Sequence, residues 1–366
     1  MLLERLRLVN FRNFDSITQL FSSGVNVFYG ENGSGKTSLL EALCLFSLGR
    51  SFRGGTVKHL VATGHPFFQA QLSLAPGAPL STTELVAVGD HQNQLKFSVD
   101  GNIARVSEVV NHLPMQLLCA NSFQMLESGA AHRRHLLDWG CFFFERAFIR
   151  TWQRFCHVLK QRNRWLKSMG PGHLHQRALA VWDREFLGCG TLVDEARRRY
   201  YALFIPALEE ALLRFLPQFR FDCAYVPGWG EMGLEGALKT RFERDRMLGY
   251  TSVGPHRGDI DILVGGVPAK QVLSRGQIKL FVCATLVARA EVLVRHSQRA
   301  CLILVDDVAA ELDRHSLARL LDDLLALGSQ VVLTSIEPLA ESKGGLRGDT
   351  GWQSMVEVPL RAVQWA

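Results

Sequence analysis

The sequence predicts an α/β fold with three parts: a core built on a parallel β-sheet, an antiparallel β-subdomain attached to that core, and a helical lobe. Three stretches of the 366 residues lead to this prediction. A glycine-rich segment at 30–37 lies between a strand-like and a helix-like run, short alternating runs fill 67–106, and residues 141–220 are helix-like and strongly charged. With 47% hydrophobic residues, the chain can bury a large core.

The glycine-rich segment matches the phosphate-binding-loop pattern of a glycine, four free positions and then Gly-Lys-Thr. Residues 25–29 predict the strand before such a loop, and the apolar spacing of 37–48 predicts the helix after it. We therefore expect ATP to bind here, with Lys36 reaching its outer phosphates and Thr37 ligating its magnesium ion. A chance glycine-rich turn is the alternative, and the flanking strand and helix disfavour it. The expected nucleotide contacts are Gly30, Glu31, Asn32, Gly33, Ser34, Gly35, Lys36, Thr37 and Ser38.

The N-terminal residues 2–9 alternate in part between polar and apolar types, which predicts a strand at the edge of a sheet. Arg12 and Asn13 follow this strand. Two interpretations stay open for them: contact with the nucleotide phosphates, or exposure in a surface turn. Further strands, separated by turn signals such as Asp100-Gly101, predict the antiparallel meander. Their ranges are 67–74, 83–88, 95–99 and 103–106.

Composition limits the class of protein. No run approaches the roughly 20 apolar residues that span a bilayer, and residues 1–10 carry Glu4, Arg5 and Arg7 where a signal peptide would be apolar. We expect a cytoplasmic protein. The eight cysteines show neither Cys-x-x-Cys pairs nor zinc-type spacing, which favours free, mostly buried thiols over a metal site or a catalytic cysteine.

Residues 141–220 hold fourteen Lys/Arg and seven Asp/Glu, a net charge of +7 in a chain whose total is +6. Arg146, Arg150 and Arg154 recur every fourth residue, so on a helix they would form one stripe that a polyanion such as DNA could contact. A solvated helix face is the alternative. The helix breaker at 170–172 predicts that this region folds back as a helical hairpin.

Three smaller patterns lie outside that region. The basic cluster 132–135 fits either a phosphate contact or a helix cap, and His256 fits a hydrogen-bonded structural residue better than a catalyst. Ser274-Arg275-Gly276-Gln277 precedes a helix expected at 278–294. Ser274 and the first amides of that helix could hold a second anion, or the serine could simply cap the helix.

An apolar run at 301–305 ends in Asp306 and Asp307, which is typical of a buried parallel strand that delivers acids to the carboxyl edge of a sheet. We expect Asp306 to hold magnesium and Asp307 to orient or deprotonate the attacking water. Two acids that begin a surface turn are the alternative. Glu311 is a second candidate for catalysis, and Asp313 lies two residues beyond it.

The phosphate loop, the serine-glycine signature, the double acid and Glu311-Leu312-Asp313, in that order, resemble the ATP-binding-cassette ATPases of the chromosome-maintenance branch. Within that branch, 254–257, 273–277 and Asp306-Asp307 are similar to the RecF family, and the similarity extends over the whole chain. The resemblance implies an ATPase head, a helical arm lobe, and a homodimer that forms on ATP and clamps DNA. It also implies that the signature residues complete the ATP site of the partner subunit; in this chain they are Ser274, Arg275, Gly276, Gln277 and Asp313.

The same resemblance implies weak, DNA-dependent ATP hydrolysis used as a switch. It further implies work with RecR-like and RecO-like proteins to load RecA at gaps between single- and double-stranded DNA in repair, replication restart and the SOS response. The chain departs from the family at Ala120-Asn121, where Pro-Glu is usual, and lacks the histidine that follows the last core strand of many such ATPases. Thr334 or Ser335 would have to replace that histidine.

The motifs divide the chain into an N-terminal head part at 1–112, a helical DNA-binding lobe at 113–248 and a C-terminal head part at 249–366. The motor subunit of a membrane transporter shares the nucleotide motifs and is the alternative function; it would need a groove for a membrane partner rather than a basic lobe. A small-molecule kinase would explain the loop but neither the signature nor the double acid.

Overall fold

The computed structural model describes residues 2–75, 82–168, 173–307, 312–339 and 355–360, with side chains left out at 173–178. The chain forms two compact units, which we describe separately. Unit 1 comprises Met1–Gln124 and Lys279–Ala366, and unit 2 comprises Met125–Ile278. The division thus falls at 124/125 and 278/279 rather than at the expected 112/113 and 248/249. Strand pairing explains the difference, because β8 (Met115–Leu118) pairs inside the parallel sheet of unit 1 and β10 (Asp259–Val264) pairs with β9 (Phe221–Val226) of unit 2.

Unit 1 contains the expected parallel sheet, with strand order β14-β3-β13-β12-β8. The predicted strands at 25–29 and 301–305 are confirmed as β3 and β12. The pairings in this sheet are parallel, and β3, β8, β12 and β13 are largely buried, as expected for a sheet covered on both faces, whereas β14 is partly exposed. The strands are β3 (Val25–Tyr29), β8 (Met115–Leu118), β12 (Leu302–Val305), β13 (Gln330–Ser335) and β14 (Val356–Pro359).

The second sheet of unit 1 is antiparallel, with strand order β2-β1-β4-β5-β6-β7. It confirms the predicted meander. The expectation for 2–9 was wrong in one respect: β1 is not an edge strand, because it pairs with β2 on one side and with β4 on the other. The strands are β1 (Leu3–Phe11), β2 (Phe14–Leu20), β4 (Phe67–Leu74), β5 (Thr83–Asp90), β6 (Leu95–Val99) and β7 (Asn102–Ala104).

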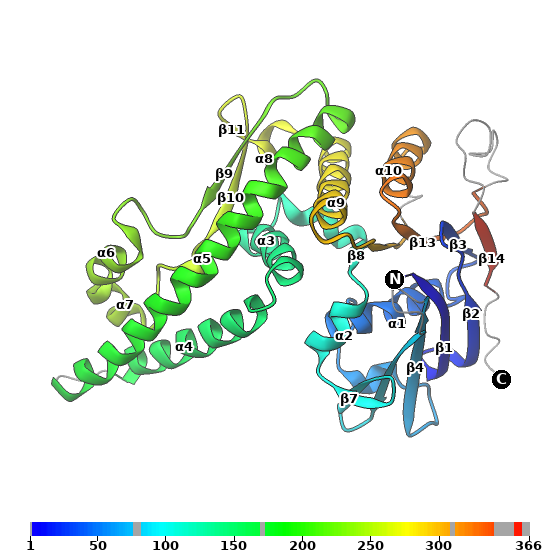
Figure 1. Ribbon diagram of the computed structural model, residues 1–366, viewed down its shortest axis with the longest axis horizontal. Helices are drawn as coiled ribbons and strands as arrows, with labels where there is room; N and C mark the ends of the chain where they lie inside the picture. Colours follow the sequence, from blue (N-terminus) through cyan, green and yellow to red (C-terminus); the bar gives the residue numbers. More distant parts are fainter. Residues whose placement is uncertain (1, 76–81, 169–172, 308–311, 340–354, 361–366) are drawn as a thin grey trace. The chain divides into compact units, whose positions relative to one another are not determined.

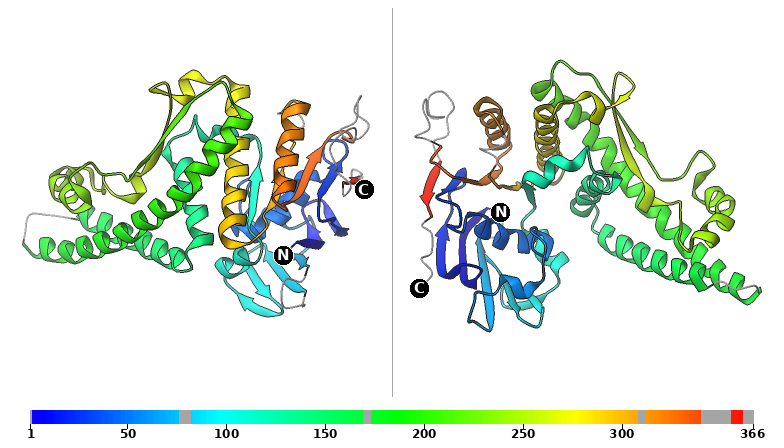
Figure 2. Two further views of the ribbon diagram at one scale, coloured as in Figure 1. Left: turned by 45° about the horizontal axis from the view of Figure 1, so that its top comes forward. Right: turned by 180° about the vertical axis from the view of Figure 1, so that it is seen from behind.

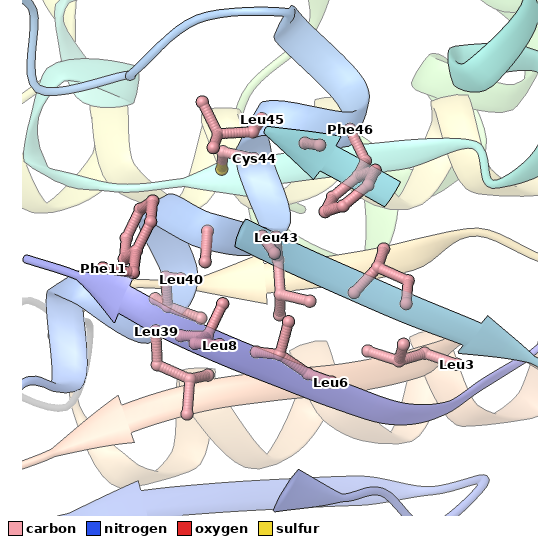
Figure 3. Packing of buried hydrophobic residues seen from close by; sticks show 14 of the residues in the cluster. Leu3, Leu6, Leu8, Phe11, Leu39, Leu40, Leu43, Cys44, Leu45 and Phe46 are labelled. Atoms are coloured by element: carbon pink, nitrogen blue, oxygen red, sulfur yellow. The ribbon is translucent and has the colours of Figure 1, made fainter. Parts of the chain in front are cut away.

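Helix α1 (Lys36–Leu48) packs against both sheets, contacting β13 and β8 on one side and β1 and β5 on the other. Ten of its thirteen residues are buried, which is typical of a helix surrounded by protein. Figure 3 shows Leu39, Leu40 and Leu43 of α1 beside Leu6 and Leu8 of β1. This packing holds the start of α1 at the carboxyl end of β3. The remaining helices of unit 1 are α2 (Val106–His112), α10 (Arg314–Ala326) and most of α9 (Arg275–Ser297).

Unit 2 is built on two long helices that lie side by side, α4 (Phe148–Ser168) and α5 (His173–Phe215) (Figures 1 and 2). They are the arms of the predicted hairpin, whose turn at 169–172 lies outside the described residues. A three-stranded antiparallel sheet and short helices complete the unit. These elements are α3 (Ala130–Phe144), β9 (Phe221–Val226), α6 (Gly233–Thr240), α7 (Phe242–Leu248), β10 (Asp259–Val264), β11 (Val267–Pro268) and α8 (Ala269–Val272).

Two fully buried arginines tie unit 2 together. Arg162 of α4 pairs with Asp183 of α5 and Asp245 of α7. Arg197 of α5 makes two hydrogen bonds to Asp138 of α3 and donates a third to the carbonyl of Pro255. Each buried guanidinium therefore has at least one carboxylate partner, without which its burial would be strongly unfavourable.

A candidate nucleotide-binding site

The glycine-rich loop connects β3 to α1, as its sequence predicts, and lines a cavity of about 450 Å³. Gly30 and Gly35 need to be glycine here. Both have positive φ, and a Cβ would lie 2.3 Å from the Leu360 carbonyl oxygen at Gly30 and 2.5 Å from the Phe14 ring at Gly35. Lys36 Nζ donates to the carbonyls of Gly30 (2.6 Å) and Glu31 (2.9 Å), so the ammonium lies over the loop. A loop with its cation in this position is suited to an anionic ligand.

Of the expected nucleotide contacts, the loop residues Asn32, Gly33, Gly35, Lys36, Thr37 and Ser38 line the cavity, together with Arg12 and Asn13. Gly30, Glu31 and Ser34 belong to the same loop but do not line it. The carbonyls of Gly30 and Glu31 serve Lys36 instead, and Ser34 is buried.

The two acids after β12 take different positions. Asp306 lines the cavity, and its Oδ1 accepts hydrogen bonds from Thr334 Oγ1 (2.9 Å) and Thr37 Oγ1 (3.3 Å). Burial raises the pKa of Asp306, and the two hydroxyl groups oppose that shift. Asp307 is exposed, lines the same cavity and has a left-handed backbone with φ of 51°. Its backbone N–H donates to Thr334 Oγ1 (2.9 Å).

Thr334 was a candidate for the missing phosphate-sensing histidine. It is fully buried at the end of β13, and its one hydroxyl proton is directed at Asp306. The hydroxyl therefore links the two acids and has no second proton to donate to a phosphate. Ser335 is also buried and does not line the cavity.

Arg12 and Asn13 both line the cavity, so they are not simply exposed turn residues. Arg12 makes two hydrogen bonds to Glu41 of α1, at 2.8 and 2.6 Å, and Ser51 donates to the same buried carboxylate. Asn13 differs, because both polar atoms of its side-chain amide are buried and have no hydrogen-bond partner among the described residues. A buried amide without a partner is unfavourable, and a phosphate or ribose group in the cavity would supply one. The residues present therefore fit a bound nucleotide.

Residues that sequence reasoning did not assign to the site also line the cavity: Arg53, His59, Val61 and Thr63. They come from the segment between α1 and β4, including the short 3-10 helix η1 (Val57–Leu60). Burial raises the pKa of Asp306, and the positive charge of Arg53, which lines the same cavity, is among the smaller influences that oppose this shift. The only signal in the sequence is the basic side chain of Arg53, and no pattern connects it to a loop nearly twenty residues earlier. Asn121 is exposed and does not line the cavity.

The signature residues lie at the start of α9. Ser274 Oγ accepts from the Gln277 N–H (3.3 Å), and Gln277 Oε1 accepts from the Ser274 N–H (2.8 Å), which makes a reciprocal cap. Ser274, Arg275 and Gly276 are exposed. The capping interpretation is therefore correct, while action on a partner subunit stays a prediction.

The two acidic candidates after Asp307 have different outcomes. Asp313 caps α10: it accepts from the Ser316 N–H (3.0 Å) and from Ser316 Oγ (2.6 Å), and these hydrogen bonds lower its pKa. Its expected role toward a partner subunit stays a prediction. Glu311 lies outside the described residues.

The basic residues of unit 2 separate into structural and exposed groups. Arg133 makes two hydrogen bonds to Asp259, and Arg134 donates to the Gly258 carbonyl. Both arginines therefore stabilise the start of β10, which is neither the helix cap nor the phosphate contact that the sequence suggests. The expected stripe is interrupted: Arg150 and Arg154 lie on α4, whereas Arg146 lies in the turn before it. All three are exposed, and Arg154 pairs with Glu185 of α5.

His256 is structural, as the sequence favours. Its Nε2 lies 2.9 Å from the Thr251 carbonyl oxygen, and its ring packs near Phe155 and Phe186. Burial lowers the pKa of His256 to about 4. The eight cysteines are free: five are buried, Cys119 and Cys223 are half-buried, and Cys156 is exposed.

Comparison with known proteins agrees with this geometry. Residues 2–343 match the family model described as the RecF/RecN/SMC N-terminal domain. A DNA replication and repair protein RecF from Pseudomonas syringae pv. syringae is 36% identical over 371 residues, covering 100% of this chain and 97% of the relative. The chain belongs to the RecF family. A RecF from Pasteurella multocida is 35% identical over 338 residues, with 92% and 93% coverage.

Solved structures extend this finding. The chain is similar to the recombination mediator protein RecF bound to ATP in the RecFOR pathway, with a TM-score of 0.81 and 25% identity over 92% of each chain. An SMC head bound to the C-terminal winged-helix domain of ScpA shares the fold, with a TM-score of 0.58 and 14% identity over 92% of this chain and 90% of the SMC chain. The chain thus has the fold of RecF and SMC head ATPases, as the sequence predicts. Among the described residues, no helix is long and apolar enough to cross a membrane.

Proposed function

We propose that this protein is an ATP-switched, DNA-binding recombination mediator. The observation that carries the proposal is the cavity of unit 1, where the phosphate loop, the Thr37–Asp306 contact and the partnerless amide of Asn13 meet. Family membership supports it, because solved relatives are named as RecF with ATP. The transporter motor subunit is not favoured.

Each part of the cavity has a task in nucleotide binding. Lys36 would exchange its loop carbonyls for the outer phosphates, and the amides at the start of α1 would add hydrogen bonds and favourable partial charge. Asn13 would donate its amide to the bound nucleotide. Thr37 and Asp306 would hold magnesium, which neutralises phosphate charge when it is bound. Their oxygens already lie 3.3 Å apart, on the side of the cavity where α1 begins.

Hydrolysis would depend on Asp307. Its carboxylate is exposed at the cavity, whereas Asp306 is held by two hydroxyl groups. We therefore assign Asp307 to orient or deprotonate the attacking water, with Glu311 as a second candidate. Turnover would be slow, because Thr334 at the end of β13 has no second proton to donate to the terminal phosphate. Its dependence on DNA is what the resemblance to the RecF family implies.

The protein would act as a homodimer in ATP, with Ser274 and its neighbours completing the site of the partner subunit. Arg146, Arg150 and Arg154 would contact DNA. As in the RecFOR pathway named for its relative, the dimer would work with RecR-like and RecO-like proteins at DNA gaps and help to load RecA. Its setting would be the cytoplasm, in repair, replication restart and the SOS response.

The test is the solution mass of the protein by size exclusion with light scattering, without nucleotide, with ADP and with ATP. A doubling of mass in ATP alone, accompanied by tighter binding of double-stranded and gapped DNA, supports the proposal. A monomer under all three conditions that binds no DNA contradicts it.

A further inference from the structure

Helix α4 carries charge of a single sign. Its 21 residues include Arg150, Arg154, Lys160, Arg164 and Lys167, all of them exposed, and not one Asp or Glu. A solvated helix face normally carries both signs, because acidic and basic residues three or four apart stabilise each other. Here the like charges at 150/154, at 160/164 and at 164/167 repel one another. This arrangement is unfavourable unless an anion lies along the helix.

The cations lie on one side of α4. Its buried residues are Phe148, Phe155, Val158, Arg162 and Leu166, which pack toward α5 and α7. The exposed cations fall on the opposite side, where Gln153 and His157 are exposed as well. From 150 to 167 the face extends over about 26 Å, since each helical residue adds about 1.5 Å. We call these exposed residues of α4 the basic face.

Most of this charge is not neutralised by the protein. Among the described residues, Arg150, Lys160, Arg164 and Lys167 have no ion-pair partner. Arg154 is the exception, because Glu185 of α5 pairs with it. The other α5 carboxylate that contacts α4, Asp183, is bonded to the buried Arg162 instead. The unpaired charge is therefore concentrated in the C-terminal half of α4, at Lys160, Arg164 and Lys167. These residues follow the Arg146, Arg150 and Arg154 stripe that the sequence indicates.

We propose that the basic face, centred on Lys160, Arg164 and Lys167, binds the phosphate backbone of double-stranded DNA. This inference rests on the proposed function and specifies its DNA contact. Duplex DNA carries one negative charge per roughly 1.7 Å of axis, so a face of about 26 Å meets a dense row of phosphates. Both surfaces are rigid, so binding orders little chain, whereas an acidic peptide would lose conformational freedom on the same face. Glu185 competes with the phosphates for Arg154.

The test compares three variants of the full-length protein for binding to a fluorescent 30-base-pair duplex in ATP, at several salt concentrations. The first replaces Lys160, Arg164 and Lys167 with Gln. The second is a charge-matched control that replaces Arg214, Lys239 and Arg246 with Gln; these cations of unit 2 have carboxylate partners at Glu210, Glu235 and Glu243. The third is Glu185→Gln, which frees Arg154. ATP affinity and the melting temperature check that each variant is folded.

The first variant should bind at least ~10-fold more weakly, and its plot of log affinity against log salt should be shallower by about 2.7, or 0.9 for each lost phosphate contact. The control should change neither quantity. Glu185→Gln should bind more tightly and steepen the slope by about 0.9, a gain that misfolding cannot produce.

The inference is overturned if the wild type binds the duplex and the first variant binds it with the same affinity and the same salt dependence. The proposed function would then remain intact. Failure of the wild type to bind the duplex overturns both. Displacement of the duplex by poly-glutamate at equal charge concentration would show that the basic face recognises acidic protein, which also overturns the inference.

Discussion

Thr334 donates its hydroxyl proton to Asp306 Oδ1 at 2.9 Å, and the Thr334 hydroxyl oxygen accepts a hydrogen bond from the backbone N–H of Asp307, also at 2.9 Å. One buried hydroxyl thus fixes the acid expected to hold magnesium and the backbone of the acid expected to act on water. The two acids are therefore coupled through Thr334, a fully buried residue at the wall of the cavity. This relationship leads to the first prediction.

Thr334→Val keeps the shape of the side chain and removes both hydrogen bonds. A hydrogen bond to a charged group contributes about 1.5–3 kcal/mol, so Asp306 should lose its orientation and the affinity for ATP in the presence of magnesium should fall ~10-fold or more. Affinity for ATP in EDTA should not change, because no phosphate contact is lost. Thr334→Ser should restore the wild-type values. An equal loss of affinity with and without magnesium would instead assign Thr334 to the phosphate.

Lys36→Ala should abolish ATP binding, because it removes the cation that offsets the outer phosphates. It also removes the two hydrogen bonds to the carbonyls of Gly30 and Glu31. Isothermal titration with ATP measures the effect, and the melting temperature without nucleotide serves as the folding control. DNA binding that requires ATP should be lost as well. ATP affinity equal to that of the wild type would mean that the phosphates lie elsewhere.

Asp307→Asn should slow ATP hydrolysis by ~100-fold or more and leave ATP binding largely intact. The left-handed backbone at Asp307 accepts asparagine easily, so the change removes the charge with little strain. Single-turnover hydrolysis and equilibrium ATP binding separate the two effects. The ATP-bound dimer should then persist longer than in the wild type. If turnover is unchanged, Glu311 becomes the leading candidate.

His256 should make unit 2 less stable in acid. Burial lowers its pKa to about 4, compared with about 6.5 in an unfolded chain, so the folded protein favours the neutral ring. The stabilisation is therefore present above pH 6.5 and is lost as the pH falls from 6.5 toward 4, amounting to about 2 kcal/mol between pH 7 and pH 5. Hydrogen exchange of α4 and α5 reports it. In His256→Gln this pH-dependent component should be absent, and an identical loss in both proteins would assign it to other groups.

Sequence patterns were sufficient to predict those elements whose conformation depends on residues that are neighbours in the chain. The phosphate loop depends on the backbone freedom of Gly30 and Gly35 and on a strand and helix next to it in the chain, so its position and neighbours could be predicted. The strand ending in Asp306 and the α4–α5 hairpin are local in the same sense. For Asn13 the sequence left two interpretations open, and the burial of its amide at the cavity without a partner favours contact with a nucleotide.

Pairings between distant residues could not be predicted. Nothing in 2–9 shows that β4, some sixty residues later, covers the second side of β1. The carboxylate partners of Arg133 and Arg197 are 126 and 59 positions away, so free and structural arginines look alike in the sequence. For the same reason Arg154 appeared equivalent to Arg150, although Glu185 neutralises it. Thr334 or Ser335 was expected to replace the missing histidine. The contact of the Thr334 hydroxyl with Asp306 could not be predicted, because it depends on the register between β12 and β13.

The last prediction concerns the proposed sharing of ATP sites between subunits. Lys36→Ala removes the working loop of a subunit but keeps its signature. Ser274→Arg keeps the loop intact. At the exposed start of α9 it removes the reciprocal cap between Ser274 and Gln277, and it adds bulk and positive charge where the phosphate of a partner subunit's ATP would lie. Each variant alone should therefore be inactive as an ATPase.

Mixed together, the two variants can form heterodimers in which one of the two composite sites joins an intact loop to an intact signature. About half of the wild-type activity per dimer should return in those species, because a symmetric dimer has two such sites. The measurement is ATP turnover at fixed total protein while the ratio of the variants is changed, with native mass spectrometry to count the heterodimers. Activity should be greatest near equal proportions, where heterodimers are most abundant. Heterodimers present without any recovered turnover would mean that each subunit completes its own site, and Ser274 would then act only as the cap of α9.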